Sequence, residues 1–178
     1  TCEEYQWLQA ALPPISAKRL FFALQKAAMN TIGRLSMGVT TGLHYGFDSG
    51  ESLDYVYRNQ PKGKNKLGEI IDRVYLNAIG WRGIRIRKAN LQNLILKAIE
   101  LTGGPKIRIV DIAGGPGRYL LDVIKDQPNE KISVLIRDVS ETSLEHGRAA
   151  AKNLGLSNVD YQHGSAFDID GISAISPK

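Results

Sequence analysis

The segment IRIVDIAGGPGRYLL, residues 107–121, limits the fold more than any other part of the sequence. It opens with β-branched residues whose near-continuous apolar character is typical of a strand in a parallel sheet covered on both faces. The loop that follows contains Gly114, Gly115 and Gly117, which allow a tight turn and a close approach of backbone to a ligand. Pro116 suits the first turn of a following helix. In open α/β folds this unit binds nucleotide-like ligands above the sheet, although an ordinary glycine-rich connection is the alternative.

The spacing of the glycines narrows the choice of ligand. A dinucleotide-binding loop requires a third glycine where Leu120 stands, and no Walker loop ending in Gly-Lys-Ser/Thr occurs. The loop instead has an acid, a small residue and two glycines at alternate positions: Asp111, Ala113, Gly115 and Gly117. This pattern resembles the first motif of class I S-adenosylmethionine-dependent methyltransferases, with Ala113 in place of the first glycine. The resemblance implies that S-adenosylmethionine is the cofactor. It also implies that Asp111 lies near the methionine end of the cofactor and that the glycines leave room for the cofactor beside the loop.

A second strand is expected over residues 132–136, and it leads to Asp138, 27 residues after Asp111. An acid at the tip of the second strand can accept hydrogen bonds from both ribose hydroxyls of a bound nucleoside. Val139, which follows it, belongs to the same predicted cofactor contact. Ser140 is then the expected N-cap of an amphipathic helix, and a third strand is expected within residues 159–168.

The end of the third strand departs from the family pattern. The family usually has Gly-Asp-Ala here, whereas this chain has Gly164, Ser165, Ala166, Phe167 and Asp168. By resemblance, Ser165 and Ala166 contact the adenine, but a serine accepts a hydrogen bond more weakly than a carboxylate, and Asp168 is the alternative acceptor. Phe167 either stacks on the purine or belongs to the core.

The length of the chain from residue 104 allows three strands and two helices, whereas the resembled family has a seven-stranded sheet. The first strand is therefore expected to keep one unpaired edge, and the chain is expected to be a fragment of a longer protein or to associate with its missing half. The predicted fold is α/β: a Rossmann-like class I methyltransferase fold, truncated after the third strand and preceded by a helical region. Residues 1–103 form the helical lid, and residues 104–178 form the first half of the S-adenosylmethionine-binding domain.

The beginning of the chain is predicted to be helical. A helix is expected over residues 16–46, with apolar side chains around much of its circumference and with four basic residues. Three roles stay open for it: packing on its own protein, lying on a membrane surface, and covering a partner. A short helix capped by Ser49 or Ser52 follows. Lys62, Lys64 and Lys66 lie in a basic turn that either contacts phosphate or is a solvated loop.

Two further helices are expected over residues 66–104, broken around Gly80 to Gly83. The second has an expected buried stripe at helical spacing, which consists of Ile84, Leu91, Leu94, Ile95 and Ala98. Arg87 lies on that stripe, and an inward guanidinium needs an anionic partner. By resemblance, Arg87 is the candidate for holding the methionine carboxylate, with Arg82 and Arg85 behind it; extension of Arg87 to the surface is the alternative.

Three longer segments, GFDSGESLDYVYRN, IDRVYLNAIGWRGIRIRK and DIAGGPGRYLLD, together resemble a bacterial family of class I methyltransferases. Members of that family can occur fused to or beside an α/β-hydrolase domain, so such a domain is a possible partner. No G-x-S-x-G segment occurs here, and hydrolase activity is therefore not expected of this chain.

Composition adds weaker constraints. The chain has a net charge of +5 and a single cysteine, Cys2, which favours a reducing compartment and a cytoplasmic location. The predicted activity is methyl transfer to a small-molecule or lipid-like acceptor; a nucleic-acid methyltransferase and a non-catalytic cofactor-fold association module are the alternatives. Because methyl displacement can rest on proximity and alignment, no catalytic residue is predicted, and no metal-ligand spacing is present.

Overall fold

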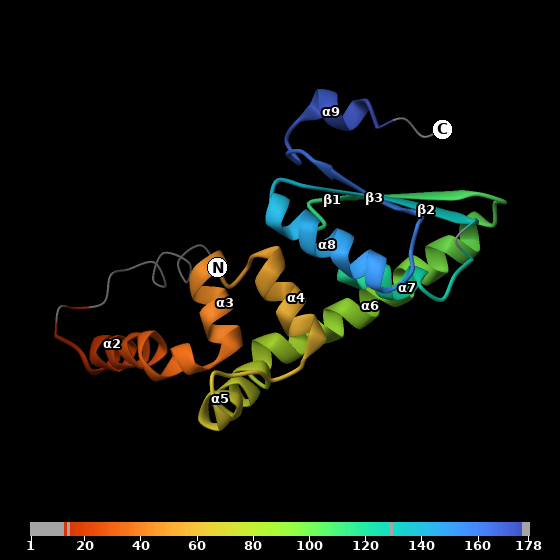
Figure 1. The fold of residues 1–178 in the computed structure, drawn as a ribbon. Coiled ribbons are helices and arrows are strands. Elements are labelled where there is room, and N and C mark those ends of the chain that lie inside the picture. The colour runs from red at the N-terminus through yellow and green to blue at the C-terminus, as the bar shows by residue number, and fades with distance from the viewer. Residues whose placement is uncertain (1–12, 14, 129, 176–178) are drawn as a thin grey trace.

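The computed structural model describes residues 13, 15–128 and 130–175, and Cys2 lies outside them. Helices form most of the first hundred residues, and strands alternate with helices after that (Figure 1). The helical elements are α2 (Ala17–Asn30), the 3₁₀ helix η1 (Ile32–Leu35), α3 (Met37–Tyr45), α4 (Gly50–Arg58), α5 (Lys66–Leu76), α6 (Ile79–Thr102), α7 (Arg118–Ile124), α8 (Glu141–Asn153) and α9 (Ile169–Ser173). The strands are β1 (Ile107–Ile112), β2 (Ile132–Asp138) and β3 (Val159–His163).

The three strands form one parallel sheet in the order β1-β2-β3. Ile107 pairs with Ile132, and Val134 pairs with Val159. Because parallel strands end at the same edge of a sheet, the glycine loop after β1 and Asp138 at the end of β2 lie next to each other. The predicted α/β fold with helices first is confirmed.

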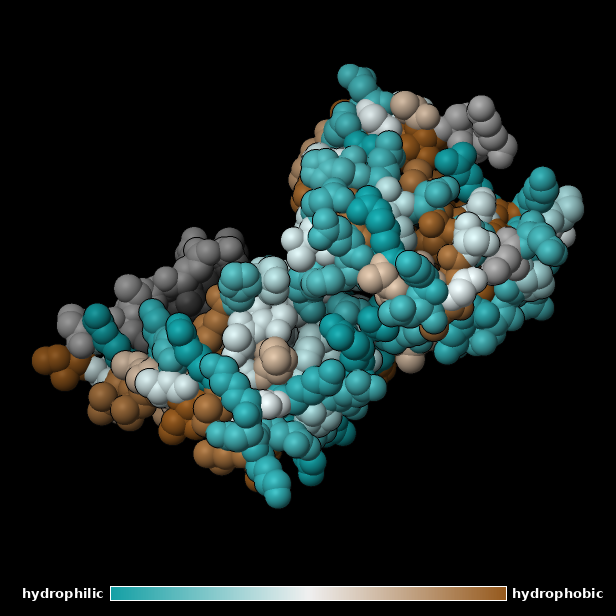
Figure 2. Space-filling view, in the orientation of Figure 1, coloured by the Kyte–Doolittle hydropathy of each residue, from teal (hydrophilic) through white to brown (hydrophobic). Residues whose placement is uncertain are grey.

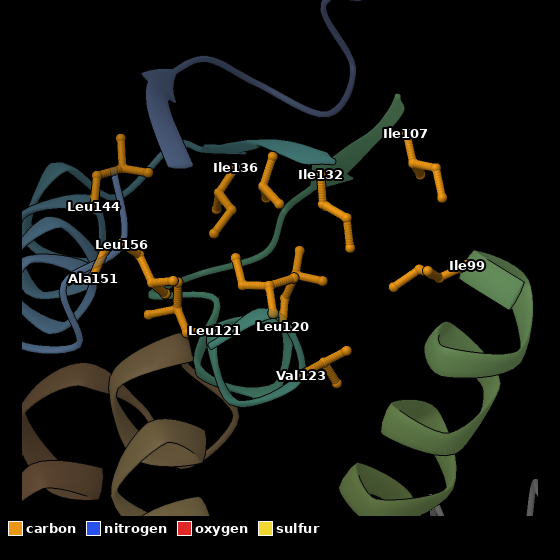
Figure 3. Close-up of a cluster of buried hydrophobic side chains, with 12 residues drawn as sticks. Ile99, Ile107, Leu120, Leu121, Val123, Ile132, Ile136, Leu144, Ala151 and Leu156 are labelled. Atoms are coloured by element: carbon orange, nitrogen blue, oxygen red, sulfur yellow. The ribbon is translucent and has the colours of Figure 1, made fainter. Parts of the chain in front are cut away.

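The main hydrophobic core lies on one face of the sheet. Helices α6, α7 and α8 cover that face (Figure 1), and Figure 3 shows side chains from α6, α7, α8 and the strands within this core. Leu121, Ile124, Ile136 and Leu144 are fully buried in it. The expectation of a sheet covered on both faces is wrong for the described residues, since Val110 on the opposite face is 41% exposed. The helices that flank the strands lie on one side, and only the short α9 follows on the other (Figure 1).

The edge of β1 that faces away from β2 has no partner strand among the described residues, as the sequence predicted. The predicted boundary at residue 103 coincides with the end of α6, where Gly103 adopts a positive φ of 59°. However, Ile99 of α6 is buried in the core of the sheet. Helix α6 therefore belongs to both parts of the chain, and the division into two domains stays a prediction.

Asp72 on α5 organises the helical region. Its side chain is fully buried, and its two oxygens accept hydrogen bonds from the hydroxyls of Ser36 (2.6 Å) and Tyr55 (2.5 Å) and from the amides of Gly38 (2.7 Å) and Lys62 (2.9 Å). Burial and the neighbouring carboxylate raise the pKa of the Tyr55 hydroxyl, so it stays a donor. One carboxylate thus joins α3, α4, α5 and the loop before α5.

The helix expected over residues 16–46 is three elements, α2, η1 and α3. The hydroxyl of Thr31 donates to Ala27 O (2.8 Å) at the end of α2, and Ser36 Oγ accepts from the Val39 amide (3.0 Å) at the start of α3. No residue of α2 is buried, although α2 contacts η1, so the three predicted roles of this helix stay open. The short helix α4 is capped by Ser49, which accepts from the Ser52 amide (3.2 Å), and this confirms one of the two predicted caps.

The break between α5 and α6 lies at Asn77 and Ala78 rather than at Gly80 to Gly83. The Asn77 side chain donates to Arg73 O (2.9 Å), and Ala78 leaves the helical conformation with φ −55° and ψ 144°. Gly80 and Gly83 continue inside α6, and a Cβ added to either would meet no atom outside the helix backbone within 4 Å, so neither glycine serves a close contact. The hydrogen bond of the Asn77 side chain therefore ends α5 before the chain reaches the glycines.

The buried stripe predicted for α6 is also wrong. Ile99 is its buried residue, Ile84 and Ile95 are partly buried, Leu94 is 64% exposed, and Ala98 is exposed. The physical reason is that α6 packs into a different hydrophobic cluster near each end. The middle of the helix instead lines a cavity.

Candidate functional site

The glycine loop between β1 and α7 is a tight backbone turn. Ala113, Gly115 and Gly117 all have positive φ, at 60°, 57° and 71°. A side chain on Gly117 would place its Cβ 2.2 Å from the Ile136 side chain, so only glycine lets the loop lie this close to β2. The Ala113 amide donates to Arg137 O (2.8 Å), which ties the loop to the same strand.

Asp138 holds the loop from the end of β2. One carboxylate oxygen accepts from the Gly115 amide (2.8 Å), and the other accepts from the Ser140 amide (2.9 Å). Ser140 caps α8 by accepting from the Ser143 amide (3.2 Å). Each carboxylate oxygen has a second lone pair, so Asp138 can also accept from ligand hydroxyls.

Asp111 lies behind the loop. It accepts a hydrogen bond from the Tyr119 hydroxyl, and a Cβ on Gly114 would lie 2.4 Å from its carboxylate. Burial raises the pKa of the Asp111 carboxyl, and the charge of Asp138 adds to that rise, whereas the hydrogen bond from Tyr119 lowers it. Burial and Asp111 also raise the pKa of Tyr119. Asp111 is therefore positioned to support the loop and α7.

Helix α4 forms the second wall of the site. Gly50 lies so close to the loop that a Cβ on it would lie 3.2 Å from Gly115 Cα. Asp54, which is 3% exposed, accepts from the Arg118 guanidinium and also pairs with Arg58 at 2.8 Å. These contacts attach the helical region to the first turn of α7.

A further contact joins α4 to α8, where His146 Nδ1 lies 2.7 Å from a carboxylate oxygen of the buried Glu51.

Helix α6 forms the third wall. Lys88 pairs with Asp122 (2.5 Å) and lies 5.4 Å from the centre of the Tyr57 ring. Arg87 is exposed and lines the cavity, and it has no hydrogen-bond or ion-pair partner among the described residues. It does not point into a core as the predicted stripe required. Arg85, expected behind it, donates to Leu76 O (2.8 Å).

These walls enclose a cavity of about 580 Å³, a size typical of small-molecule sites. Six of the predicted cofactor residues line it: Arg87, Ala113, Gly114, Gly115, Gly117 and Asp138. The lining also has an apolar part, which consists of Leu53, Tyr57, Leu91 and Leu94. The cavity thus combines a carboxylate, an unpaired guanidinium and an apolar surface.

The residues predicted at the adenine end lie outside the cavity lining. Ser165 Oγ accepts from the Phe167 amide (3.1 Å), and the Phe167 side chain is 94% exposed. Asp168 pairs with Arg137 (2.6 Å) and caps α9 by accepting from the Gly171 amide (3.0 Å). These bonds give Asp168 a structural role.

Two other predicted cofactor residues, Ala166 and Val139, are also exposed and outside the lining.

Sequence reasoning missed Asp54, Tyr57 and Arg118. Arg118 could have been recognised from the sequence, because it is the first residue of α7 and the positive end of a helix disfavours a basic side chain. An arginine in that position indicates an anionic partner nearby. The partner, Asp54, is 64 residues away in the sequence, and no local pattern indicated its role.

The whole chain, residues 1–178, matches the model of a family described as "Putative methyltransferase". The chain belongs to this family. It is also 40% identical to "Uncharacterized protein YnbC" of Escherichia coli (strain K12) over 181 residues, which cover the full chain and 31% of that protein. The chain therefore spans about a third of the length of this relative. The predicted methyltransferase family is confirmed.

A solved structure shares the fold of this chain. A possible exported protein of Bordetella parapertussis matches 92% of this chain and 51% of its own at a TM-score of 0.60 and 15% identity. PKMT2 of Rickettsia typhi, solved in complex with AdoHcy, is 30% identical over 35% of this chain and 12% of its own, at a TM-score of 0.32. The match to the Bordetella parapertussis protein extends over both the helical region and the sheet of this chain.

Two features are absent from the described residues of this chain. No group of three or more His, Cys, Asp or Glu side chains is arranged to hold a metal ion. No described helix is long and apolar enough to cross a membrane.

Proposed function

We propose that this chain binds S-adenosylmethionine in the cavity between α4, α6 and the glycine loop, and that it transfers the methyl group to a small-molecule or lipid-like acceptor. The observation that carries the proposal is the placement of Asp138 and Arg87 in one cavity with a loop that admits close backbone contact. These groups match the ligand's ribose hydroxyls and carboxylate.

The residues have distinct roles in this proposal. Asp138 accepts hydrogen bonds from the ribose, and Arg87 pairs with the methionine carboxylate. Asp111 and Tyr119 keep the loop in place from behind. Bound cofactor supplies an electrophilic methyl group, and the protein's contribution is to align the acceptor with it and to exclude water.

The candidates for contact with the adenine of the cofactor remain Ser165, Ala166 and Phe167.

The acceptor class is proposed from the apolar wall. Leu53 and Tyr57 on α4, with Leu91 and Leu94 on α6, form a surface on the lid side of the cavity. Such a surface favours an acceptor with hydrocarbon or ring character. An α/β-hydrolase domain as partner and a cytoplasmic location stay predictions.

Calorimetric titration with S-adenosylhomocysteine tests the proposal. We expect saturable binding, with NADH as a control that does not bind. Asp138→Asn keeps an oxygen for the Gly115 amide but loses the charge, and binding weakens by about tenfold to a hundredfold, as for a hydrogen bond to a charged group. Arg87→Gln weakens binding by about tenfold through loss of its ion pair.

Arg82→Gln is the matched control, because Arg82 is exposed on the same helix and does not line the cavity. It leaves the affinity unchanged. Failure of the unchanged chain to bind S-adenosylhomocysteine contradicts the proposal, and so does an equal effect of Arg82→Gln and Arg87→Gln.

A further inference from the structure

The N-terminal end of the molecule has an apolar surface whose side chains are exposed in the part of the chain that the structure describes. Every residue of α2 is exposed, and Leu20, Phe21 and Leu24 are each more than half exposed. The helical period places these three on one side, opposite Arg19 and Lys26, whereas Phe22, which is 55% exposed, lies on the side of the basic residues. Figure 2 shows apolar residues gathered over this end of the molecule. Soluble monomers rarely leave such a continuous apolar helix face without a binding role.

Helices η1 and α5 have further exposed apolar residues near α2. Helix η1 packs against both α2 and α5, and Ile32 of η1 is 58% exposed. Helix α5 has its own exposed apolar row of Leu67, Ile70 and Val74, which follows helical spacing. We call these apolar residues of α2, η1 and α5, with the basic residues beside them, the N-terminal surface.

The basic residues come from two parts of the sequence. Residues 15–47 contain Lys18, Arg19, Lys26 and Arg34 and no acidic residue. The loop that contains Lys62, Lys64 and Lys66 is fixed beside η1, because the Lys64 amide donates to Leu35 O (2.9 Å) and the Met37 amide donates to Lys62 O (3.0 Å). The fold thus adds three lysines to a region that is already basic.

Apolar and basic side chains on one exposed surface suit an anionic lipid bilayer. The apolar face enters the boundary between headgroups and acyl chains, and the basic residues meet lipid phosphates. A second copy of the chain is a poorer occupant, since it would bring the same positive charges face to face. We propose that the N-terminal surface binds the chain to membranes that contain anionic lipid.

The N-terminal surface is separate from the cofactor cavity, since none of its residues lines that cavity. Membrane binding and S-adenosylhomocysteine binding can therefore succeed or fail independently. A membrane-bound enzyme would meet lipid-like acceptors at high local concentration, which is compatible with the proposed function but not required by it.

Co-sedimentation of the 178-residue chain with vesicles tests the proposal. We expect binding to vesicles of phosphatidylcholine mixed with phosphatidylglycerol, weaker binding as salt is raised, and little binding to phosphatidylcholine alone. Lys64→Ala/Lys66→Ala weakens binding by about fivefold for each charge lost. Phe21→Ser/Leu24→Ser weakens it by about tenfold or more, because apolar area no longer enters the bilayer.

The matched controls are Lys97→Ala and Leu101→Ser on α6, where Leu101 is 77% exposed and both residues lie outside the N-terminal surface. Both control variants keep full binding. In hydrogen exchange, anionic vesicles slow the amides of α2. All the variants keep the circular dichroism spectrum and the cooperative urea unfolding of the unchanged chain, which shows that they are folded.

Three results would overturn the proposal: no binding to anionic vesicles, equal binding to neutral and anionic vesicles, or equal losses in the control variants. Self-association that Phe21→Ser/Leu24→Ser abolishes, without vesicle binding, would identify a second copy as the occupant instead.

Discussion

Ala113 is held in a backbone conformation that usually belongs to glycine. Its φ is 60°, where a side chain costs about 1–2 kcal/mol, and the family motif has glycine at this position. The hydrogen bond from its amide to Arg137 O holds the residue there. The loop is therefore under local strain next to the cavity, and the sequence alone showed the substitution but not the φ.

Ala113→Gly is expected to stabilise the chain by about 0.5–1 kcal/mol. The substitution removes the strain, and the greater freedom of glycine in the unfolded chain offsets part of the gain. Urea unfolding followed by circular dichroism measures the difference. The control is Ala149→Gly on the exposed side of α8, which is expected to destabilise by about 1 kcal/mol. A similar loss in both variants would argue against a positive φ at residue 113.

Asp111 makes stability depend on pH. Its carboxyl pKa is raised in the folded chain, mainly by burial, so the folded state binds more protons than the unfolded state between the two pKa values. Stability from this group is therefore highest at low pH and falls as pH rises through the raised pKa. Asp111→Asn keeps an acceptor for the Tyr119 hydroxyl and removes the titration.

Urea unfolding at a series of pH values measures this effect. The stability of Asp111→Asn relative to the unchanged chain is expected to increase as pH rises above the ordinary aspartate pKa. A difference that is independent of pH would show that Asp111 titrates alike in the folded and unfolded chain.

At the scale of elements, α5 shows how one polar residue can set the arrangement of several helices. Gly68, Asp72 and Leu76 lie four residues apart on one face of α5, and all three are buried. An acidic residue in this row could have been recognised from the sequence as a buried hydrogen-bond acceptor. Its four donors come from α3, α4 and the loop before α5, and none of them could be assigned without the fold.

Asp72→Ala is expected to destabilise the chain by about 3–5 kcal/mol, because four donors, three of them in buried hydrogen bonds, lose their acceptor. Thermal and urea unfolding measure the loss. Glu69→Ala on the same helix is the control: its pair with Arg73 is exposed, and its removal costs at most about 0.5 kcal/mol. A cost below about 1 kcal/mol for Asp72→Ala would show that water replaces the carboxylate.

Across the whole molecule, the sequence predicted the features that depend on a few neighbouring residues. The three strands, the glycine loop and Asp138 follow from runs of a few residues, and the structure has them where they were expected. The α4 wall could not be predicted, because it depends on Asp54 meeting Arg118 and on Glu51 meeting His146, 95 residues away. The buried stripe of α6 failed for the same reason, since the packing partners of a helix are decided by the fold.

Helix α6 has 24 residues without a break and is anchored at both ends: Ile84 packs against the cluster of Tyr55, Val56 and Leu76, and Ile99 packs into the sheet core. Such a helix is about 36 Å long and resists bending. It acts as a rigid spacer that sets the distance between the two clusters, and the cavity lies along its middle. The extent of the cavity along α6 is therefore set by the spacing of the two clusters, whereas its width across the helix depends on how closely α4 and the glycine loop approach α6.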